Sequence, residues 1–248
     1  MPTLIVGKKI ISFEGGAPSV VIPDYIEEIA DNAFYECGYI ADLTLPDGVR
    51  EIGNYAFKMC YSMKSIALPK MIDHMGSGVF QQCWALGKVI LPSGTSVIGN
   101  DMFSGCRALA DLTIPDTVEE IDRIALAGCV SLRRLRIDPS RLEILPAASR
   151  ATAVLTYMSE HHGDTAANDV IDGYAEKRSR LIADLAINHN EQQAIHYMTS
   201  HGILQSGDIS DYIDKATGSG RTEIAAMLLE EREATRTGED DFEWDPFA

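Results

Sequence analysis

The amino-acid sequence predicts an α+β protein in which a solenoid of short parallel strands is followed by an α-helical domain. Two observations carry this prediction. Cysteine and proline recur every 23 residues over the first part of the 248-residue chain, and beyond residue 146 apolar residues follow a period near 3.6. We expect three segments: a solenoid of five 23-residue units over residues 1–146, a helical domain over 147–234 and an acidic, disordered tail over 235–248.

The 23-residue period holds in several columns of the sequence. Each cysteine is preceded by a bulky apolar residue three positions earlier, and each unit carries one proline at a fixed place. These columns are Cys37, Cys60, Cys83, Cys106 and Cys129; Phe34, Phe57, Phe80, Phe103 and Leu126; and Pro23, Pro46, Pro69, Pro92 and Pro115. A unit of this size cannot bury its own apolar residues, so neighbouring units must stack into a continuous core.

Each unit is expected to contain one short strand. Leu43-Thr44-Leu45 and its equivalents place two apolar side chains inward and one residue outward. The proline that follows ends the strand ladder because it has no N–H to donate. We expect a capping strand at residues 19–22 and a tight turn on the far side at Gly53, Gly76 and Gly99. Six turns at a strand spacing of ~4.8 Å give a sheet about 25–30 Å wide.

The repeated unit I-P-x-x-[VI]-x-x-I-x-x-x-A-F-x-x-C-x-x-[LIM]-x-x-[LIV]-x-[LI] resembles the BspA-like leucine-rich repeats of bacterial proteins over about residues 19–146. This resemblance implies a curved solenoid with a parallel sheet on its concave face. The last unit departs from the pattern, because Leu126 replaces phenylalanine and Pro139 arrives one residue late, after Asp138. Both departures fit a terminal unit.

The cysteine column allows three interpretations, of which buried thiols are favoured. Side chains at one repeated position run parallel and do not face each other as a disulfide requires. Ligands spaced 23 residues apart form a line, which does not suit a tetrahedral metal site. Unpaired buried cysteines favour a reducing compartment.

Beyond Pro146, apolar spacing predicts helices over 151–161, 164–187, 190–201, 206–216 and 221–233. Asn190 with Gln193 resembles a capping pair, and Gly202 is expected to end that helix. Residues 220–230 resemble the second helix of an ankyrin repeat, and residues 190–201 align with them at an offset of 30. This resemblance implies an ankyrin-like helical cap on the solenoid.

The net charge of −16 is concentrated in the C-terminal region. Residues 151–248 contain 7 basic and 19 acidic residues, a net of −12. An acidic excess disfavours nucleic acid as a partner. No apolar run approaches the ~18 residues of a membrane span, and the N-terminal lysines follow the first apolar stretch, an order that is wrong for a secretory signal. Within the tail, Phe242, Trp244 and Phe247 mark either a solvated end or a short binding segment.

Catalytic motifs do not stand out in the sequence. There is no glycine-rich phosphate loop, no G-x-S-x-G and no H-E-x-x-H. The adjacent His161 and His162 point in different directions, and no carboxylate or cysteine completes a site around His189 and His196. We therefore predict no catalytic residue, no metal site and no cofactor, and a protein that is not an enzyme.

The outward strand positions are the best candidates for function, because the repeat does not dictate them. With the positions that begin each strand, they run from acidic and small to basic, ending near Arg133 and Arg141. The predicted partner-binding residues are Asp42, Thr44, Ser65, Lys88, Ile90, Asp111, Thr113, Arg134 and Arg136, with Ala67 on the same face, and Tyr61 and Trp84 just after the cysteines. Polar cover of a sheet, and packing of the two aromatics at a turn, remain alternatives.

The predicted function is non-catalytic protein–protein interaction through the concave face, in a monomeric bacterial adaptor located in the cytoplasm. The resemblance to BspA-like proteins supplies the alternative of a cell-surface adhesin that binds host or matrix proteins, which would require a signal or anchor. An enzyme of unknown class and a purely structural role are the remaining hypotheses.

Overall fold

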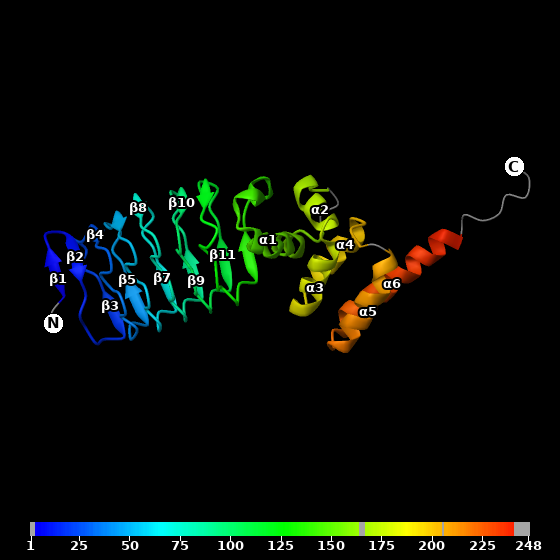
Figure 1. The fold of residues 1–248 in the computed structure, drawn as a ribbon, viewed down its shortest axis with the longest axis horizontal. Coiled ribbons are helices and arrows are strands. Elements are labelled where there is room, and N and C mark those ends of the chain that lie inside the picture. The colour runs from blue at the N-terminus through cyan, green and yellow to red at the C-terminus, as the bar shows by residue number, and fades with distance from the viewer. Residues whose placement is uncertain (1–2, 164–166, 205, 241–248) are drawn as a thin grey trace, which may run out of the picture. The chain divides into compact units, whose positions relative to one another are not determined.

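The protein is described by a computed structural model that covers residues 3–163, 167–204 and 206–240 (Figure 1). It divides into two compact units, Met1–Ala153 and Val154–Ala248. The first unit holds all strands of the described chain, and the second holds helices α2 to α6. Helix α1 (Ala147–Glu160) crosses the division.

Each turn of the solenoid contributes one strand of three residues to a parallel sheet, as the sequence predicted. Successive strands pair at a 23-residue offset, so that Leu43 lies opposite Ile66. In the described part of the solenoid the order is β13-β11-β9-β7-β5-β3. The strands are β3 (Ser19–Val21), β5 (Asp42–Thr44), β7 (Ser65–Ala67), β9 (Lys88–Ile90), β11 (Asp111–Thr113) and β13 (Arg134–Arg136).

Each turn from β4 to β12 also contributes a two-residue strand on the other side of the core (Figure 1). These strands are β4 (Glu28–Ile29), β6 (Glu51–Ile52), β8 (His74–Met75), β10 (Val97–Ile98) and β12 (Glu120–Ile121). At the N-terminus, β1 (Leu4–Val6) and β2 (Lys9–Ser12) form an antiparallel pair, and β2 continues in parallel onto β4. The sequence reasoning missed this pair, because its residues lie outside the 23-residue period.

Phenylalanine rings form a continuous stack through the core of the solenoid. Phe13, which precedes the repeat, lies 4.9 Å from Phe34 between ring centroids. The next three centroid distances along the column are 5.3, 5.7 and 5.7 Å, ending at Phe103. Rings at this separation gain stacking in addition to burial. Leu126 continues the column as a buried aliphatic side chain.

The cysteines are buried thiols, as predicted, and each donates a weak hydrogen bond to a backbone carbonyl of the preceding turn. The Sγ of Cys83 lies 3.0 Å from the carbonyl oxygen of Phe57, and that of Cys106 lies 3.0 Å from that of Phe80. All five are free, and Cys129 is the half-buried member. Burial raises the pKa of the Cys83 thiol well above its ordinary value.

The prediction of tight turns at the glycine column was wrong. Gly53 and Gly76 do not adopt left-handed backbone; a Cβ on Gly53 would lie 2.4 Å from the backbone nitrogen of Asp31, and one on Gly76 would lie 2.6 Å from that of Asn54. These glycines therefore allow close approach of neighbouring turns. The left-handed positions lie in other columns, occupied by Asn32, Tyr55, Gly78 and Asp101 and by Glu36, Met59, Gln82, Gly105 and Gly128.

The last repeat leads into helix. Pro139 begins the 3-10 helix η1 (Pro139–Ile144), and the Asp138 carboxylate accepts a hydrogen bond of 2.8 Å from the backbone N–H of Ser140. Leu142 and Leu145 are buried. The late proline of the terminal unit is thus the start of a helix.

The second unit contains two helix pairs that repeat at an offset of 30 residues, the spacing that the ankyrin-like resemblance predicted. Helices α3 (Ser179–His189) and α5 (Ile209–Gly218) begin 30 residues apart, as do α4 (Gln192–Ser200) and α6 (Thr222–Asp240). Left-handed residues also recur between the members of each pair, Asn190 with φ 60° and Gly220 with φ 72°. In both pairs the next N–H donates to a carbonyl five residues earlier, at 2.8 Å.

Three expectations in this region need correction. The helix predicted over 164–187 is divided into α2 (Asp169–Glu176) and α3, because Arg178 leaves helical geometry with φ −138° and its guanidinium lies 4.3 Å from the Tyr174 ring centre. Asn190 ends α3 and does not cap α4, whereas Gly202 does end α4 with φ 66°. Helix α6 continues to Asp240, into the predicted tail, while Phe242, Trp244 and Phe247 lie outside the described residues.

Candidate interaction surface

The outward positions of the six three-residue strands form one exposed surface, which we call the strand face. In every strand the middle residue is buried and the two flanking residues point outward, because side chains alternate along a strand. The strand face consists of Ser19, Val21, Asp42, Thr44, Ser65, Ala67, Lys88, Ile90, Asp111, Thr113, Arg134 and Arg136.

The structure brings all the predicted strand residues together on this face. Thr44, Ala67, Ile90 and Thr113 stand in one column across adjacent strands, and Arg136 follows them, half-buried. Ile90 is 63% exposed, which is high for an isoleucine. The prediction missed Val21, which is 72% exposed, because its segment was interpreted as a cap alone.

The basic end of the strand face is organised by ion pairing. The Nη1 of Arg136 lies 2.6 Å from the Oδ1 of Asp111 on the neighbouring strand. Arg141, just beyond, donates to the backbone carbonyl of Asp116. Exposed pairs of this kind contribute little to stability, but they hold the guanidinium groups in place over β11.

A hollow of about 480 Å³ lies on the strand face between β9 and β11. In the described strands β9 pairs with β11 through Lys88 and Asp111 alone, whereas β7 and β9 pair at three positions. Ile90 lines the hollow, together with Thr113 and Arg136. An apolar side chain therefore stands beside cations and one carboxylate. The sequence gave no signal for this loosened pairing, because the repeat length is unchanged there.

Tyr61 and Trp84 do not lie on the strand face; each stands in a loop, four residues before a strand. Their ring centroids are 4.2 Å apart, and the Arg107 guanidinium lies 4.9 Å from the Trp84 ring centre. A Cβ on Gly38 would meet the Tyr61 ring at 2.9 Å. The column Gly38, Tyr61, Trp84 and Arg107 is thus a stack in which each group covers the next. Trp84 nevertheless remains 42% exposed. The sequence reasoning missed Arg107.

The histidines of the second unit are involved in packing. His161 stacks on Tyr157 at 4.0 Å, and His201 stacks on Tyr197 at 3.9 Å between ring centroids. The Tyr197 hydroxyl donates to the Asp172 carboxylate at 2.8 Å. Across the described residues, no three metal-ligating side chains gather at one point. Nor does any helix in the described ranges combine the length and the apolar character that crossing a membrane requires.

A parallel solenoid whose turns repeat an apolar strand, a proline, a phenylalanine and a cysteine defines the class of leucine-rich repeat proteins. Within that class, the family described as BspA type Leucine rich repeat region matches residues 12–138 in six copies. The chain belongs to this family.

Similar solved structures come from bacteria. A leucine rich cell surface protein from Faecalibacterium prausnitzii A2-165 is 29% identical, with a TM-score of 0.53, over 56% of this chain and 38% of that one. A Leucine Rich Repeat protein from T. pallidum is 32% identical, with a TM-score of 0.51, over 53% of this chain and 64% of that one. The chain thus covers less than two thirds of either protein. No curated protein matches the chain.

Proposed function

We propose that the chain is a non-catalytic interaction module that binds a protein partner through the strand face. The observation that carries this proposal is the contrast between two sets of columns. Interior columns repeat apolar residues, phenylalanine and cysteine, while the strand-face columns change from turn to turn. Solenoid proteins use such an extended surface for binding, since packing does not constrain it.

The chemistry of the strand face suggests the kind of segment that would bind. Lys88, Arg134 and Arg136 make the end near β13 basic, on a chain of net charge −16. The hollow at Ile90 offers an apolar contact next to these cations. A partner segment with an apolar side chain beside carboxylates would fit both features. Nucleic acid and membrane insertion form no part of the proposal.

The remaining parts of the proposal concern chemistry and place. We propose a monomeric bacterial adaptor in the cytoplasm, where a reducing environment would keep the five thiols free. No catalytic role is proposed, because binding accounts for the strand face without a reacting group.

Charge reversal at the basic end tests the proposal. Affinity capture from the native organism's lysate would compare wild type with an Arg134→Glu, Arg136→Glu double variant, after circular dichroism has shown that the variant is folded. A matched control reverses two exposed charges off the strand face, Lys70→Glu and Arg123→Glu. We expect the partner to be retained by wild type and control and lost by the double variant. A partner retained equally by all three proteins would contradict the strand face as the binding surface.

A cell-surface adhesin that binds host or matrix proteins is the second candidate function. The observation that favours it is the similar structure from F. prausnitzii, which is described as a cell surface protein. Fractionation of the native organism distinguishes the two candidates. Protein found at the cell surface or in the culture supernatant supports the adhesin, and protein confined to the cytosolic fraction contradicts it.

A further inference from the structure

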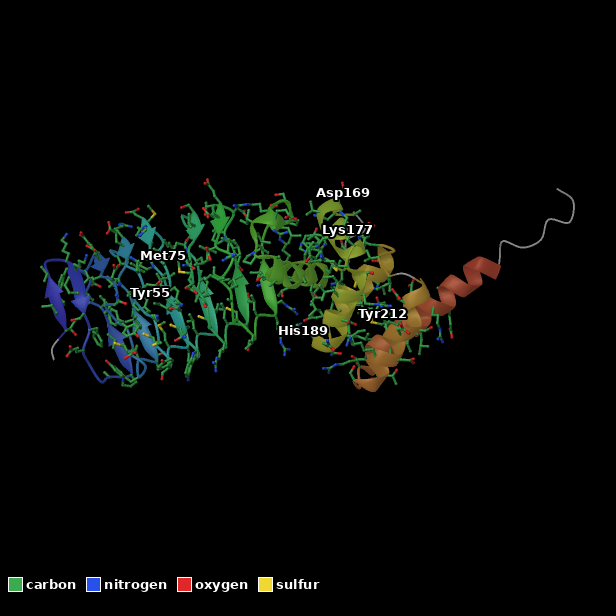
Figure 2. All side chains as sticks on the ribbon, in the orientation of Figure 1. Tyr55, Met75, Asp169, Lys177, His189 and Tyr212 are labelled. Atoms are coloured by element: carbon green, nitrogen blue, oxygen red, sulfur yellow. The ribbon has the colours of Figure 1, made fainter. Side chains whose placement is uncertain are left out.

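The ladder of two-residue strands is interrupted once in the described solenoid, between β8 and β10. The short strands form one sheet that ends at β8 and a second sheet made of β10 and β12. On the strand-face side the same two turns remain joined through β7 and β9. The solenoid is therefore open along one edge only, and Met75 of β8 marks that edge in Figure 2.

Hydrogen bonds between turns locate the interruption. At the end of each short strand a backbone N–H donates to a carbonyl of the preceding turn at 2.8–2.9 Å. The bonds run from Ala30 to Ile10, Gly53 to Ile29, Gly76 to Ile52 and Asp122 to Ile98. Gly99 stands at the equivalent position in the fourth turn, and within the described chain its N–H makes no such bond to the carbonyl of Met75. The equivalent bond from Ser96 to Asp73 is absent there as well.

The glycine column shows the same separation independently. A Cβ on Gly53 or Gly76 would collide with the backbone of the preceding turn, at 2.4 and 2.6 Å. A Cβ on Gly99, in the same column, would meet no described atom within 4 Å. The fourth turn therefore stands away from the third at this edge.

A hollow of about 340 Å³, which we call the edge cleft, fills this separation. Residues 72–77 form one wall, and residues 94–99 form most of the other. Thr95 lies in the cleft at a column position that is otherwise apolar, as in Ile72 and Val118. It is 6% exposed, and its hydroxyl has no hydrogen-bond partner among the described residues. A buried hydroxyl in this condition is costly unless a ligand or water satisfies it.

We propose that the edge cleft binds an extended peptide segment of a protein partner, which would run parallel to β8 and β10 and join them. One wall presents the carbonyls of Asp73 and Met75, and the other presents the N–H groups of Ser96 and Gly99. Both sets continue the pattern of the paired turns. A backbone with donors on one edge and acceptors on the other satisfies both walls, which is the arrangement of strand addition. The Thr95 hydroxyl favours a small polar side chain at the inward position.

Amide hydrogen exchange on the free full-length chain tests the opening first. Gly76 and Asp122 are internal references, because their N–H groups are bonded in the equivalent position. We expect the Gly99 amide to exchange about 100-fold faster than that of Gly76. Exchange of Gly99 as slow as that of Gly76 would mean that the turns are paired and would overturn the proposal. Protection that rises with protein concentration would also overturn it, because the occupant would then be a second copy of the chain.

A phage-displayed library of random dodecapeptides, selected on the full chain, tests the occupant. Selected peptides should slow exchange at Gly99 and bind at least ~10-fold more weakly to Gly99→Val, a variant whose side chain enters the cleft without a clash. N-methylation of alternate peptide residues should cost as much, because recognition is through the backbone. Failure to select any peptide that protects Gly99, or tolerance of Gly99→Val or of every N-methyl group, would show that the cleft holds water only.

The strand-face double variant Arg134→Glu, Arg136→Glu separates this proposal from the proposed function. The two surfaces share no residue, so this variant should bind the selected peptides as tightly as wild type does. Loss of peptide binding in the double variant would place the peptides on the strand face and overturn the edge cleft as their site.

Discussion

The solenoid and the helical unit are both built from repeats, yet different contacts repeat in them. In the solenoid, identical side chains recur at each junction between turns, so that Phe57 stacks between Phe34 and Phe80 and each thiol bonds to a preceding carbonyl. In the helical unit, the helix starts and the left-handed residues Asn190 and Gly220 recur at 30-residue spacing, while the packed side chains differ.

This difference shows where each region can change without loss of fold. A solenoid column is constrained by its neighbours above and below, so a departure from it stands out and has a local cause. Thr95 and Gly99 are such departures, and both lie in the edge cleft. A helical pair tolerates substitutions on its packed faces as long as the turn between its helices is kept.

Removal of one ring from the phenylalanine stack should have the largest effect. Phe57→Ala should lower the free energy of unfolding of the solenoid by about 3–5 kcal/mol, because a fully buried ring leaves a cavity. Trp84 fluorescence in a Trp244→Phe background reports this unit, since these are the two tryptophans of the chain. Val130→Ala, at a side chain that is 80% exposed, is the control and should change it by less than ~0.5 kcal/mol. Equal effects of the two substitutions would contradict the stack as a source of stability.

The glycine column should divide into a sensitive and a tolerant position. Gly53→Ala should destabilise the solenoid by about 2 kcal/mol, because its methyl group would lie 2.4 Å from a backbone nitrogen. Gly99→Ala should be neutral to within ~0.5 kcal/mol, because its methyl group enters the edge cleft. Urea unfolding of both variants measures the difference. Similar losses at the two positions would show that the third and fourth turns are as close as the others.

Alkaline pH should weaken the solenoid and spare the helical unit, which has no cysteine. Burial raises the pKa of the Cys129 thiol from its ordinary value of 9.0 to about 11. The unfolded chain therefore loses this proton first, so the stabilisation is complete below about pH 9 and is lost as pH rises toward 11. By pH 10 the loss should be about 1 kcal/mol. Urea unfolding at pH 8 and pH 10 measures it, and Cys129→Ala should reduce it; equal losses in the two units would argue against thiol ionisation.

The left-handed residues of the helical unit should give the smallest effects. Asn190→Ala and Gly220→Ala should each cost about 0.5–1 kcal/mol, because alanine resists positive φ. Asn190→Gly should not destabilise the unit. Helix unfolding followed by far-ultraviolet circular dichroism measures all three variants. A large loss at one position and none at the other would break the 30-residue equivalence.

The sequence predicted the solenoid well because its constraint is periodic. Cysteine, proline and phenylalanine columns reveal turn length, strand position and inward face, since each residue meets its equivalent one turn away. The β1–β2 pair and Phe13 escaped prediction because they precede the period and join it at other offsets. The left-handed column was assigned to Gly53 because a glycine suggests a turn, whereas neighbouring backbone explains this one.

The candidate site was predicted in part. The alternation in Leu43-Thr44-Leu45 was enough to place residues on the strand face. The hollow at Ile90 and the edge cleft depend on small displacements between turns of equal length, and no residue count records those. In the helical unit, the break at Arg178 interrupts a continuous apolar pattern, so periodicity alone favoured one long helix over 164–187.

The most direct measurement is hydrogen–deuterium exchange of the full chain with and without the partner captured by wild type. The account predicts protection in peptides that contain residues 42–44, 65–67, 88–90, 111–113 and 134–136, which are the strands of the exposed sheet. Protection confined to residues beyond 154, with these strands unchanged, would contradict binding through the strand face.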